Sequence, residues 1–333
     1  MKKYLIKRIL LVIPTFLGIT LVTYAMIRLA PGDFTTLKLD MQGALKTGTV
    51  GTEIIDQEKK LYGLDKPIII GYFDWMKKFM VLDLGNSRKD GRPVSSRIAE
   101  ALPITLLLNF ITLIIVYIIS VPLGIISAVK KNSFFDRSTS LLLFILYSLP
   151  SFWIALLLLI FFSGGEFLNM FPLGGFISDY AEKAPFFQKA GNIVWHLVLP
   201  VITLTYGSFA FLSRYARANM LDVINQQYIT TARAKGLSEN RVIFIHAFRN
   251  SMVPLVTLMA SLLPGLLGGS VIVESIFSIP GMGMLAFEAI LSRDIPVIMA
   301  ISSISALLTL AGILSSDLAY ALVDPRIRLD TKT

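Results

Sequence analysis

Few residue types that can do chemistry occur together in this chain of 333 residues. It has no cysteine, which excludes disulfides, thiolate metal sites and cysteine nucleophiles. Its two histidines, His196 and His246, lie in different segments, and no HExxH pattern or carboxylate cluster accompanies them. The chain also lacks a GxxxxGK[ST] phosphate loop for ATP. We therefore expect no catalytic residue, no metal site and no cofactor on this chain.

Two carboxylates stand in apolar runs, where an ionisable side chain usually has a function. Asp317 lies in the last run and Glu274 near the end of the preceding one. A transporter driven by protons or sodium needs an intramembrane carboxylate pair or an unwound ion site. Asp317 alone is weak support for that mechanism, and a carboxylate at an interface or in helix packing explains it better. We expect the energy source to reside on another chain.

The segment 228–250, YITTARAKGLSENRVIFIHAFRN, is basic and patterned as two short helices. Lys235 and Gly236 are typical of a helix C-terminus, because a cation favours the negative end of the helix dipole and glycine tolerates positive φ. Ser238 is the predicted N-cap of the second helix. The first helix is predicted over 219–234, and its apolar face would carry Leu221, Ile224, Tyr228 and Ala232. From the residues alone, this hairpin either lies on anionic lipid or docks a protein.

The composition indicates which elements surround the hairpin. Hydrophobic residues make up 54% of the chain, charged residues only 16%, and the mean hydropathy is +0.69. The apolar residues come in blocks of about 20 or more, the length that a helix needs to cross a bilayer. We therefore predict an all-α polytopic membrane protein with six transmembrane helices. The predicted spans are 9–27, 102–129, 138–163, 193–213, 251–277 and 297–323.

The net charge of +9 would fit nucleic-acid binding in a soluble protein, but in a membrane protein it reflects basic cytoplasmic loops. About half of the 31 lysines and arginines fall in the short segments that become cytoplasmic when both termini are inside. We thus expect no nucleic acid as partner. The predicted parts are a cytoplasmic N-terminus and first span (1–29), an external helical insertion (30–100), a five-helix core (101–325) containing the cytoplasmic loop 214–250, and a cytoplasmic tail (326–333).

Prolines interrupt several predicted spans, and each removes a backbone hydrogen bond that neighbouring groups must replace. A single proline usually marks a static kink, whereas six of them favour a bundle that bends around a cavity. The six are Pro14, Pro122, Pro150, Pro200, Pro254 and Pro264. The predicted translocation path runs past Tyr147, Ser148, Pro150, Ser151, Pro264, Gly265, Gly268, Gly269 and Ser270.

Ordered motifs along nearly the whole chain resemble those of a known family. Tyr228-Ile-Thr-Thr-Ala-Arg-Ala-Lys-Gly-Leu-Ser, followed by His246-Ala-Phe-Arg-Asn, resembles the coupling loop of ABC-importer permeases. More specifically, the chain is similar to the B-type permease subunit of the dipeptide/oligopeptide/nickel family. The other matching motifs are Arg28-Leu-Ala-Pro-Gly-Asp, Tyr62-Gly-Leu-Asp-Lys-Pro, Leu102-Pro-Ile-Thr-Leu, Glu274-Ser-Ile-Phe-Ser-Ile-Pro-Gly-Met-Gly, Ser292-Arg-Asp-Ile-Pro-Val and Asp324-Pro-Arg-Ile-Arg.

The resemblance implies the type I ABC importer permease fold and a defined set of partners. These are a second, homologous permease subunit, two cytoplasmic ATPase subunits that bind ATP and Mg, an external substrate-binding protein, and the lipid of a prokaryotic inner membrane. It assigns coupling to the ATPases to Tyr228, Thr231, Ala232, Ala234, Lys235, Gly236, Leu237 and Ser238. It places Glu274, Pro280, Gly281 and Gly283 in an external loop.

The chain departs from the general coupling pattern at two places. Thr230 stands where that pattern has a glutamate, and the segment 246–249 lacks the later proline. The peptide branch of the family tolerates these changes, so docking is still expected, but a contact made by the glutamate is not transferred to Thr230.

The resemblance also bounds the function. It implies import of dipeptides or oligopeptides, and the alternatives within the same class are nickel chelates and oligosaccharides. Two functions from other classes remain open: a membrane scaffold whose hairpin only binds lipid or a partner, and a secondary transporter that uses Asp317.

Overall fold

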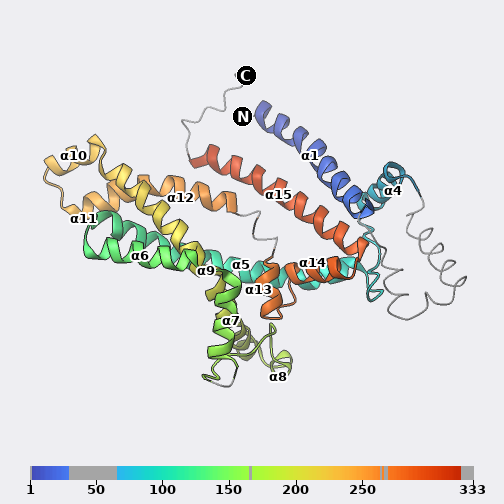
Figure 1. Ribbon diagram of the computed structural model, residues 1–333. Helices are drawn as coiled ribbons and strands as arrows, with labels where there is room; N and C mark the ends of the chain where they lie inside the picture. Colours follow the sequence, from blue (N-terminus) through green and yellow to red (C-terminus); the bar gives the residue numbers. More distant parts are fainter. Residues whose placement is uncertain (1, 30–65, 165–166, 263–264, 266–268, 324–333) are drawn as a thin grey trace, which may run out of the picture. The chain divides into compact units, whose positions relative to one another are not determined.

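The computed structural model describes residues 2–29, 66–164, 167–262, 265 and 269–323, and within these ranges every regular element is a helix (Figure 1). Much of the predicted insertion 30–100, all of the tail 326–333, and Pro264 and Gly268 lie outside these residues. The helices are α1 Lys2–Leu29, α4 Ile68–Met80, α5 Val94–Val129, α6 Phe134–Ser148, α7 Ser151–Phe162, α8 Asp179–Glu182, α9 Phe186–Ile224, α10 Gln227–Ala234, α11 Glu239–Arg241, the π-helix η2 Val242–Ala247, α12 Phe248–Leu262, α13 Val271–Ile276, α14 Met282–Leu291 and α15 Ile295–Val323.

Among the described residues, four helices are long and apolar enough to cross a membrane, and a bent pair makes a possible fifth span. The four lie in α1, α5, α9 and α15 and confirm the first, second, fourth and sixth predicted spans. The predicted third span, 138–163, is the bent pair: α6 and α7 meet at 93°. Proline disfavours helical backbone in the residue before it, and Leu149, which precedes Pro150, is extended with ψ 130°.

The predicted fifth span, 251–277, is not one helix in the described residues. It holds α12, which ends at Leu262, and the short α13, which begins at Val271. Gly269 has φ +64°, a backbone conformation that favours glycine and ends helical geometry. Ser270 follows with extended backbone and caps α13, because its hydroxyl accepts a hydrogen bond from the Val273 N–H.

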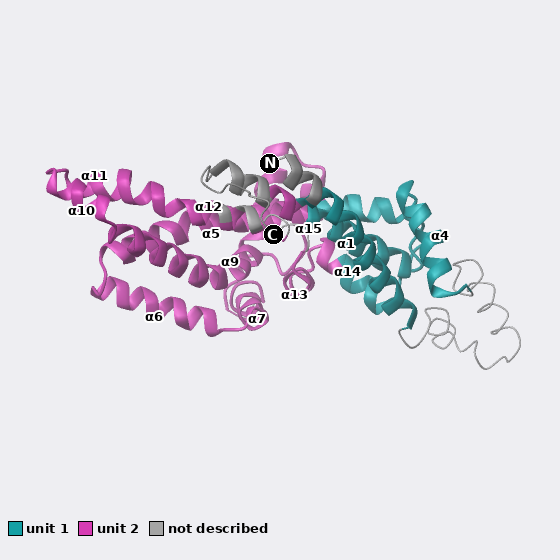
Figure 2. Ribbon diagram, turned by 90° about the horizontal axis from the view of Figure 1, so that it is seen from above, with its two compact units in different colours: residues 1–102, 285–311 teal, residues 103–284, 312–333 magenta. Residues whose placement is uncertain are grey.

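The chain divides into two compact units, which Figure 2 colours separately. Unit 1 comprises residues 1–102 and 285–311, and unit 2 comprises residues 103–284 and 312–333. In unit 1, α4 packs against α1 through an aromatic cluster that includes Tyr24, Tyr72 and Phe79. Thr20 and Tyr72 share a buried hydrogen bond of 2.9 Å between their hydroxyls, so the described part of the predicted insertion is fastened to the first span.

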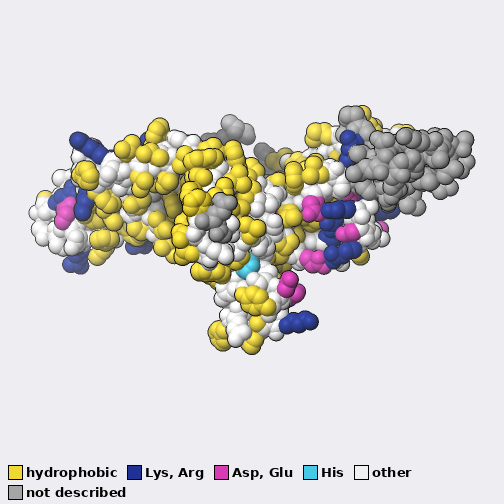
Figure 3. All heavy atoms as spheres, turned by 60° about the horizontal axis from the view of Figure 1, so that its bottom comes forward, with side chains coloured by type: hydrophobic (Ala, Val, Ile, Leu, Met, Phe, Trp, Pro, Cys, Tyr) yellow, Lys and Arg dark blue, Asp and Glu magenta, His cyan; other side chains and the backbone are white. Residues whose placement is uncertain are grey.

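Two hydrophobic clusters occur among the described residues of unit 2. One joins α5, α9, α10, η2 and α12 around residues such as Met220, Ile229 and Val242. The other joins α5, α7, α9 and α13 around Leu108 and Phe277. Hydrophobic side chains also spread over much of the face in Figure 3, as expected for a surface that meets lipid or another apolar helix.

Two contacts hold α9 against its neighbours. Gly124 on α5 lies so close to α9 that an added Cβ would be 2.4 Å from the Ser213 carbonyl oxygen and 2.7 Å from the Ala216 Cβ. The Asp136 carboxylate on α6 accepts two hydrogen bonds of 2.8 Å from the Arg217 guanidinium on α9. Asp136 is almost fully buried, so this pair is shielded from solvent screening.

We predict that Gly124→Ala destabilises the protein, because the new methyl group must push α5 away from α9. Overpacking of this kind costs about 1–3 kcal/mol. The matched control is Gly191→Ala on α9, where nothing lies within 4 Å of the added Cβ. Thermal unfolding of the purified protein in detergent should show a lower midpoint for Gly124→Ala only. Equal midpoints for the two variants would contradict this account of the helix contact.

Candidate functional site

The hairpin predicted from the sequence exists, but its first helix begins later than predicted. Helix α9 continues to Ile224, and α10 starts at Gln227 after Gln226, whose backbone is extended with ψ 148°. The predicted single helix 219–234 is therefore two helices. The break moves the buried face of α10 to Ile229 and Ala232, while Tyr228, predicted on that face, has 42% of its surface exposed.

Helix α10 ends as predicted, through a turn that requires glycine. Gly236 has φ +77°. Its N–H donates to the Arg233 carbonyl at 2.9 Å, and the Leu237 N–H donates to the Ala232 carbonyl at 3.4 Å. These two bonds form a Schellman motif, in which the residue after the glycine packs back on the helix. Leu237 packs against the same hydrophobic cluster as Ile229.

An ion pair crosses the turn. The Arg233 guanidinium donates to the Glu239 carboxylate at 2.6 Å, and both side chains are largely exposed. The hydrogen bond from Arg233 lowers the pKa of the Glu239 carboxyl below its ordinary value. Since a lowered pKa adds stability only above the ordinary pKa, the pair contributes at neutral pH and is lost in acid. Solvent screening limits that contribution to about 0–1 kcal/mol.

The eight residues assigned to coupling fall into two groups. Ala232 is buried and Leu237 half-buried, and both pack within their own chain against residues such as Val242 and Ile243. Packing within the chain thus explains why residue 232 is small. The exposed group, available to another protein, comprises Tyr228, Thr231, Ala234, Lys235, Gly236 and Ser238. Ser238 precedes α11 as predicted, but its side chain makes no capping hydrogen bond.

The second half of the hairpin continues directly into α12. α11, η2 and α12 follow one another without a break from Glu239 to Leu262. The π-helical stretch Val242–Ala247 places its buried residues against α10. At the exposed edge, the Asn250 side-chain amide donates to the Tyr228 hydroxyl at 2.8 Å and joins α10 to α12.

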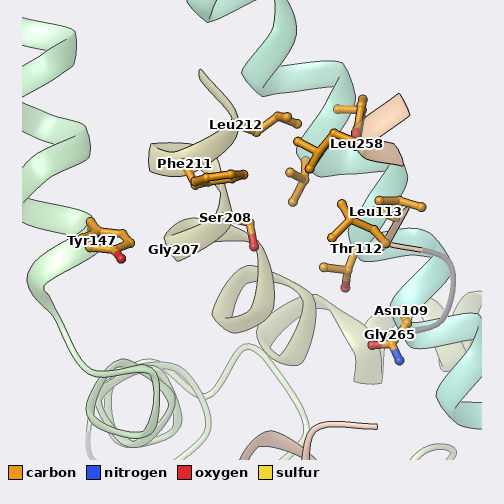
Figure 4. Close-up of a pocket in the computed structure, with 13 residues that line it drawn as sticks. Asn109, Thr112, Leu113, Tyr147, Gly207, Ser208, Phe211, Leu212, Leu258 and Gly265 are labelled. Atoms are coloured by element: carbon orange, nitrogen blue, oxygen red, sulfur yellow. The ribbon is translucent and has the colours of Figure 1, made fainter. Parts of the chain in front are cut away.

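An open cavity of 510 Å³ lies among α5, α6, α9 and α12 of unit 2 (Figure 4). Its wall is mostly apolar, with Leu113, Phe211 and Leu258 as examples. Polar groups come from Asn109 and Thr112 on α5, Tyr117 on α5, Tyr147 on α6 and Ser208 on α9. No lysine, arginine, aspartate or glutamate is among the described residues that line it. The hydroxyls of Thr112, Tyr117 and Ser208 already donate to main-chain carbonyls, so they present acceptor oxygens to the cavity. The described part of the wall thus has polar atoms but no fixed charge.

The predicted translocation path matches this cavity only in part. Tyr147 and Gly265 line it, whereas Ser148, Pro150, Ser151, Gly269 and Ser270 do not. Sequence reasoning missed Asn109, Thr112 and Ser208. The first two could have been found, because Asn109 and Thr112 are polar residues within an apolar run and lie three positions apart. That spacing puts them on one helix face, which Val116 continues.

The residues predicted for an external loop surround a buried carboxylate. Glu274 on α13 is fully buried, Gly281 and Gly283 are buried beside it, and Pro280 is exposed. Asp317 lies in α15, but its side chain is outside the described residues. Within the part of the chain that the structure describes, no three His, Asp or Glu side chains form a metal-binding group. A chain without a metal site remains a prediction.

Comparison with known proteins identifies the family. Residues 120–329 match the model of the binding-protein-dependent transport system inner membrane component family. The chain is 40% identical to the oligopeptide transport system permease protein AppB of Bacillus subtilis, over 98% of this chain and 99% of that protein. The chain belongs to this permease family. That result confirms the resemblance inferred from the ordered motifs.

Other relatives agree along the whole permease. It is 34% identical to the inner membrane ABC transporter permease protein YejB of Escherichia coli, over 98% of this chain and 99% of that one. It is also 34% identical to the peptidoglycan transport system permease protein YejB of Agrobacterium fabrum, with both chains fully covered. The permease is thus a multi-pass protein of the inner membrane.

A solved structure supports the fold. The structure titled as inward facing conformations of the MetNI methionine ABC transporter matches with a TM-score of 0.54 over 70% of the permease and 98% of that chain. At 17% identity this match shows the fold alone. It agrees with the predicted type I ABC importer permease fold.

We predict that Gly236→Ala loosens the α10 turn of the permease, because a side chain at positive φ costs about 1–2 kcal/mol. Gly236→Asn is the matched control, since asparagine tolerates this conformation better. Hydrogen exchange of the amides in α10 should be faster in the alanine variant and close to wild type in the asparagine variant. Unchanged exchange in both variants would show that the turn does not depend on glycine.

Proposed function

We propose that this permease is one of two unlike membrane subunits of an ATP-driven importer that carries oligopeptides or dipeptides from an external binding protein. The observation that supports this most strongly is its near full-length similarity to the oligopeptide permease of Bacillus subtilis. Nickel chelates or oligosaccharides are the alternative cargo. ATP and Mg bind to two separate ATPase subunits at the cytoplasmic face, where both termini of the permease also lie.

The ATPases dock on the exposed end of α10 and the turn at Gly236. Ala234, Lys235 and Ser238 are exposed there, while Ile229 and Ala232 anchor α10 to the rest of the chain. A partner that binds this end of α10 therefore binds a helix that is itself packed against η2. We propose that α10 and the turn move as one body when the ATPases close.

The continuous helix from α11 to α12 carries that movement to the cavity. It begins directly after the turn, and its last residues include Leu258 and Leu262, which line the cavity. At about 1.5 Å per residue this helix is roughly 35 Å long. A displacement at the docking surface thus shifts one wall of the cavity, which allows the inward-open and outward-open states to differ in affinity for cargo.

The cavity suits part of a peptide. The hydroxyl oxygens of Thr112, Tyr117 and Ser208, which already donate to main-chain carbonyls, can still accept hydrogen bonds from peptide N–H groups. The apolar remainder of the wall accepts side chains of varied shape. A wall without a fixed charge places no charge requirement on the cargo. The polar groups of a peptide main chain match such a wall.

Uptake measurements test the cargo. The complex, purified through a tag on this permease and reconstituted in proteoliposomes with its binding protein, should import labelled di- and pentapeptides when ATP is present. Nickel chelate and labelled oligosaccharide serve as the comparison substrates. Uptake of either of these without peptide uptake would overturn the peptide assignment.

A bulky residue on the docking surface tests the coupling. We expect Ala234→Trp to reduce ATP-dependent uptake by about tenfold or more, since loss of a packed contact is worth about 1–3 kcal/mol. Lys131→Trp is the control, because Lys131 is also exposed but lies in the short connection between α5 and α6. The amount of permease in the membrane should be the same for both variants. Normal uptake with Ala234→Trp would mean that the ATPases dock elsewhere.

A further inference from the structure

Glu274 in unit 2 is a fully buried carboxylate whose oxygens are all engaged. Its Oε1 accepts hydrogen bonds of 3.2 Å from the Thr105 hydroxyl and 3.2 Å from the Ser270 N–H. Its Oε2 accepts one of 2.9 Å from the Met284 N–H. Three separate parts of the chain thus meet at one anionic group: α5, the start of α13 and the first turns of α14.

Three glycines make room for this carboxylate. A Cβ at Gly269 would lie 2.7 Å from Oε1, and a Cβ at Gly281 or Gly283 would lie 2.6 or 2.9 Å from Oε2. Real Cβ atoms do not approach other atoms this closely. The backbone can therefore surround Glu274 only because these positions lack side chains. These three glycines thus leave the space that the Glu274 carboxylate occupies.

The direction of the hydrogen bonds requires an acceptor at position 274. Thr105 accepts a hydrogen bond of 2.7 Å from the Met282 N–H, which leaves its single hydroxyl proton for Glu274. The other two partners are backbone N–H groups, which can only donate. A glutamine at position 274 would place its NH₂ group, a donor, opposite at least one of these donors, and that hydrogen bond would be lost. Position 274 therefore needs a group that accepts these hydrogen bonds, and not only a side chain of this shape.

The junction stands next to the cavity on two sides. Thr105 precedes the cavity residue Asn109 by about one helical turn on α5. Gly269 and Ser270 follow the cavity residue Gly265 in the chain. Through Thr105 and the Ser270 N–H, the Glu274 carboxylate thereby joins the α5 wall to the start of α13.

We propose that Glu274 is a positioning residue for transport: its buried carboxylate locks the starts of α13 and α14 to α5 and holds the part of α5 that carries the cavity residue Asn109. This inference rests on the proposed function, because the wall matters only if cargo passes it. Glu274 does not contact the cargo. It acts through the elements that it joins.

Two variants remove the lock in different ways. Glu274→Gln removes the charge, and Thr105→Val removes the hydroxyl with little change in volume. The matched controls are Thr105→Ser, which keeps the hydroxyl, and Glu182→Gln, which neutralises an exposed carboxylate. Uptake per assembled complex should fall about 10- to 100-fold in the first two, as expected from loss of a charged hydrogen bond, and stay near wild type in the controls. ATP hydrolysis without binding protein should remain within about twofold of wild type, because the ATPase docking surface is untouched.

A thiol probe measures the lock without any transport assay. The chain has no cysteine, so Val273→Cys introduces a single thiol at a position that is almost fully buried beside Glu274. N-ethylmaleimide should label this thiol slowly in membranes, and about 10- to 100-fold faster when Glu274→Gln or Thr105→Val is added. Thr105→Ser should leave the labelling rate unchanged.

The outcomes separate the two proposals. Wild-type uptake and slow labelling in both Glu274→Gln and Thr105→Val would overturn the positioning role. Less assembled complex with unchanged uptake per complex and unchanged labelling would make Glu274 a folding residue only, which also overturns it. If the wild-type complex imports no peptide, the proposed function fails, and the labelling rates still decide whether Glu274 locks the junction.

Discussion

The fold depends on the need to satisfy every backbone polar group away from water. In a bilayer this need permits helices and tolerates interruptions only where the protein itself replaces the lost partners. The described ends of two interrupted predicted spans in unit 2 obey this rule. The Leu149 carbonyl, at the bend between α6 and α7, accepts a hydrogen bond of 2.7 Å from the Tyr206 hydroxyl. At the start of α13, the Ser270 N–H donates to Glu274. At each break, another part of the protein thus replaces a lost hydrogen-bond partner of the backbone. The cavity residue Tyr147 lies close to the first of these breaks.

The exposed hairpin is also stabilised by contacts within the protein, although its outer side chains are polar. Its short helix α10 has only eight residues and would be marginal by itself in water. Burial of Ile229 and Ala232 against η2 and the Schellman turn at Gly236 supply the stability that helix propensity cannot. The proposed docking of the ATPases requires a surface that stays folded when another protein binds to it. The hairpin meets this requirement by being part of a hydrophobic core while its outer residues stay free for contact.

Sequence reasoning predicts what local chemistry determines and fails where distant residues meet. Apolar runs gave four of the spans, and Lys235-Gly236 gave the end of α10 with its positive φ. The break between α9 and α10 was missed because 225–226 holds no proline or glycine, and the packing of Ile229 overrides the periodic pattern. The partners of Glu274 were also out of reach, since Thr105 is separated from it by 169 residues. Of the cavity, only Tyr147 and Gly265 were foreseen, because the facing of a uniformly apolar helix depends on its neighbours.

The π-helical stretch Val242–Ala247 has a consequence for how the family can vary. A π turn holds one residue more than the α-helical turn it replaces, and such turns arise mostly as single-residue insertions at functional sites. If the same six residues were α-helical, everything before them would be rotated by about 100° relative to α12. The turn at Gly236 would then point in another direction, while the part of α12 that lines the cavity stayed in place. Relatives that keep the same direction of the Gly236 turn must therefore keep the π turn, or lose it together with one residue, even where the other residues of the segment differ.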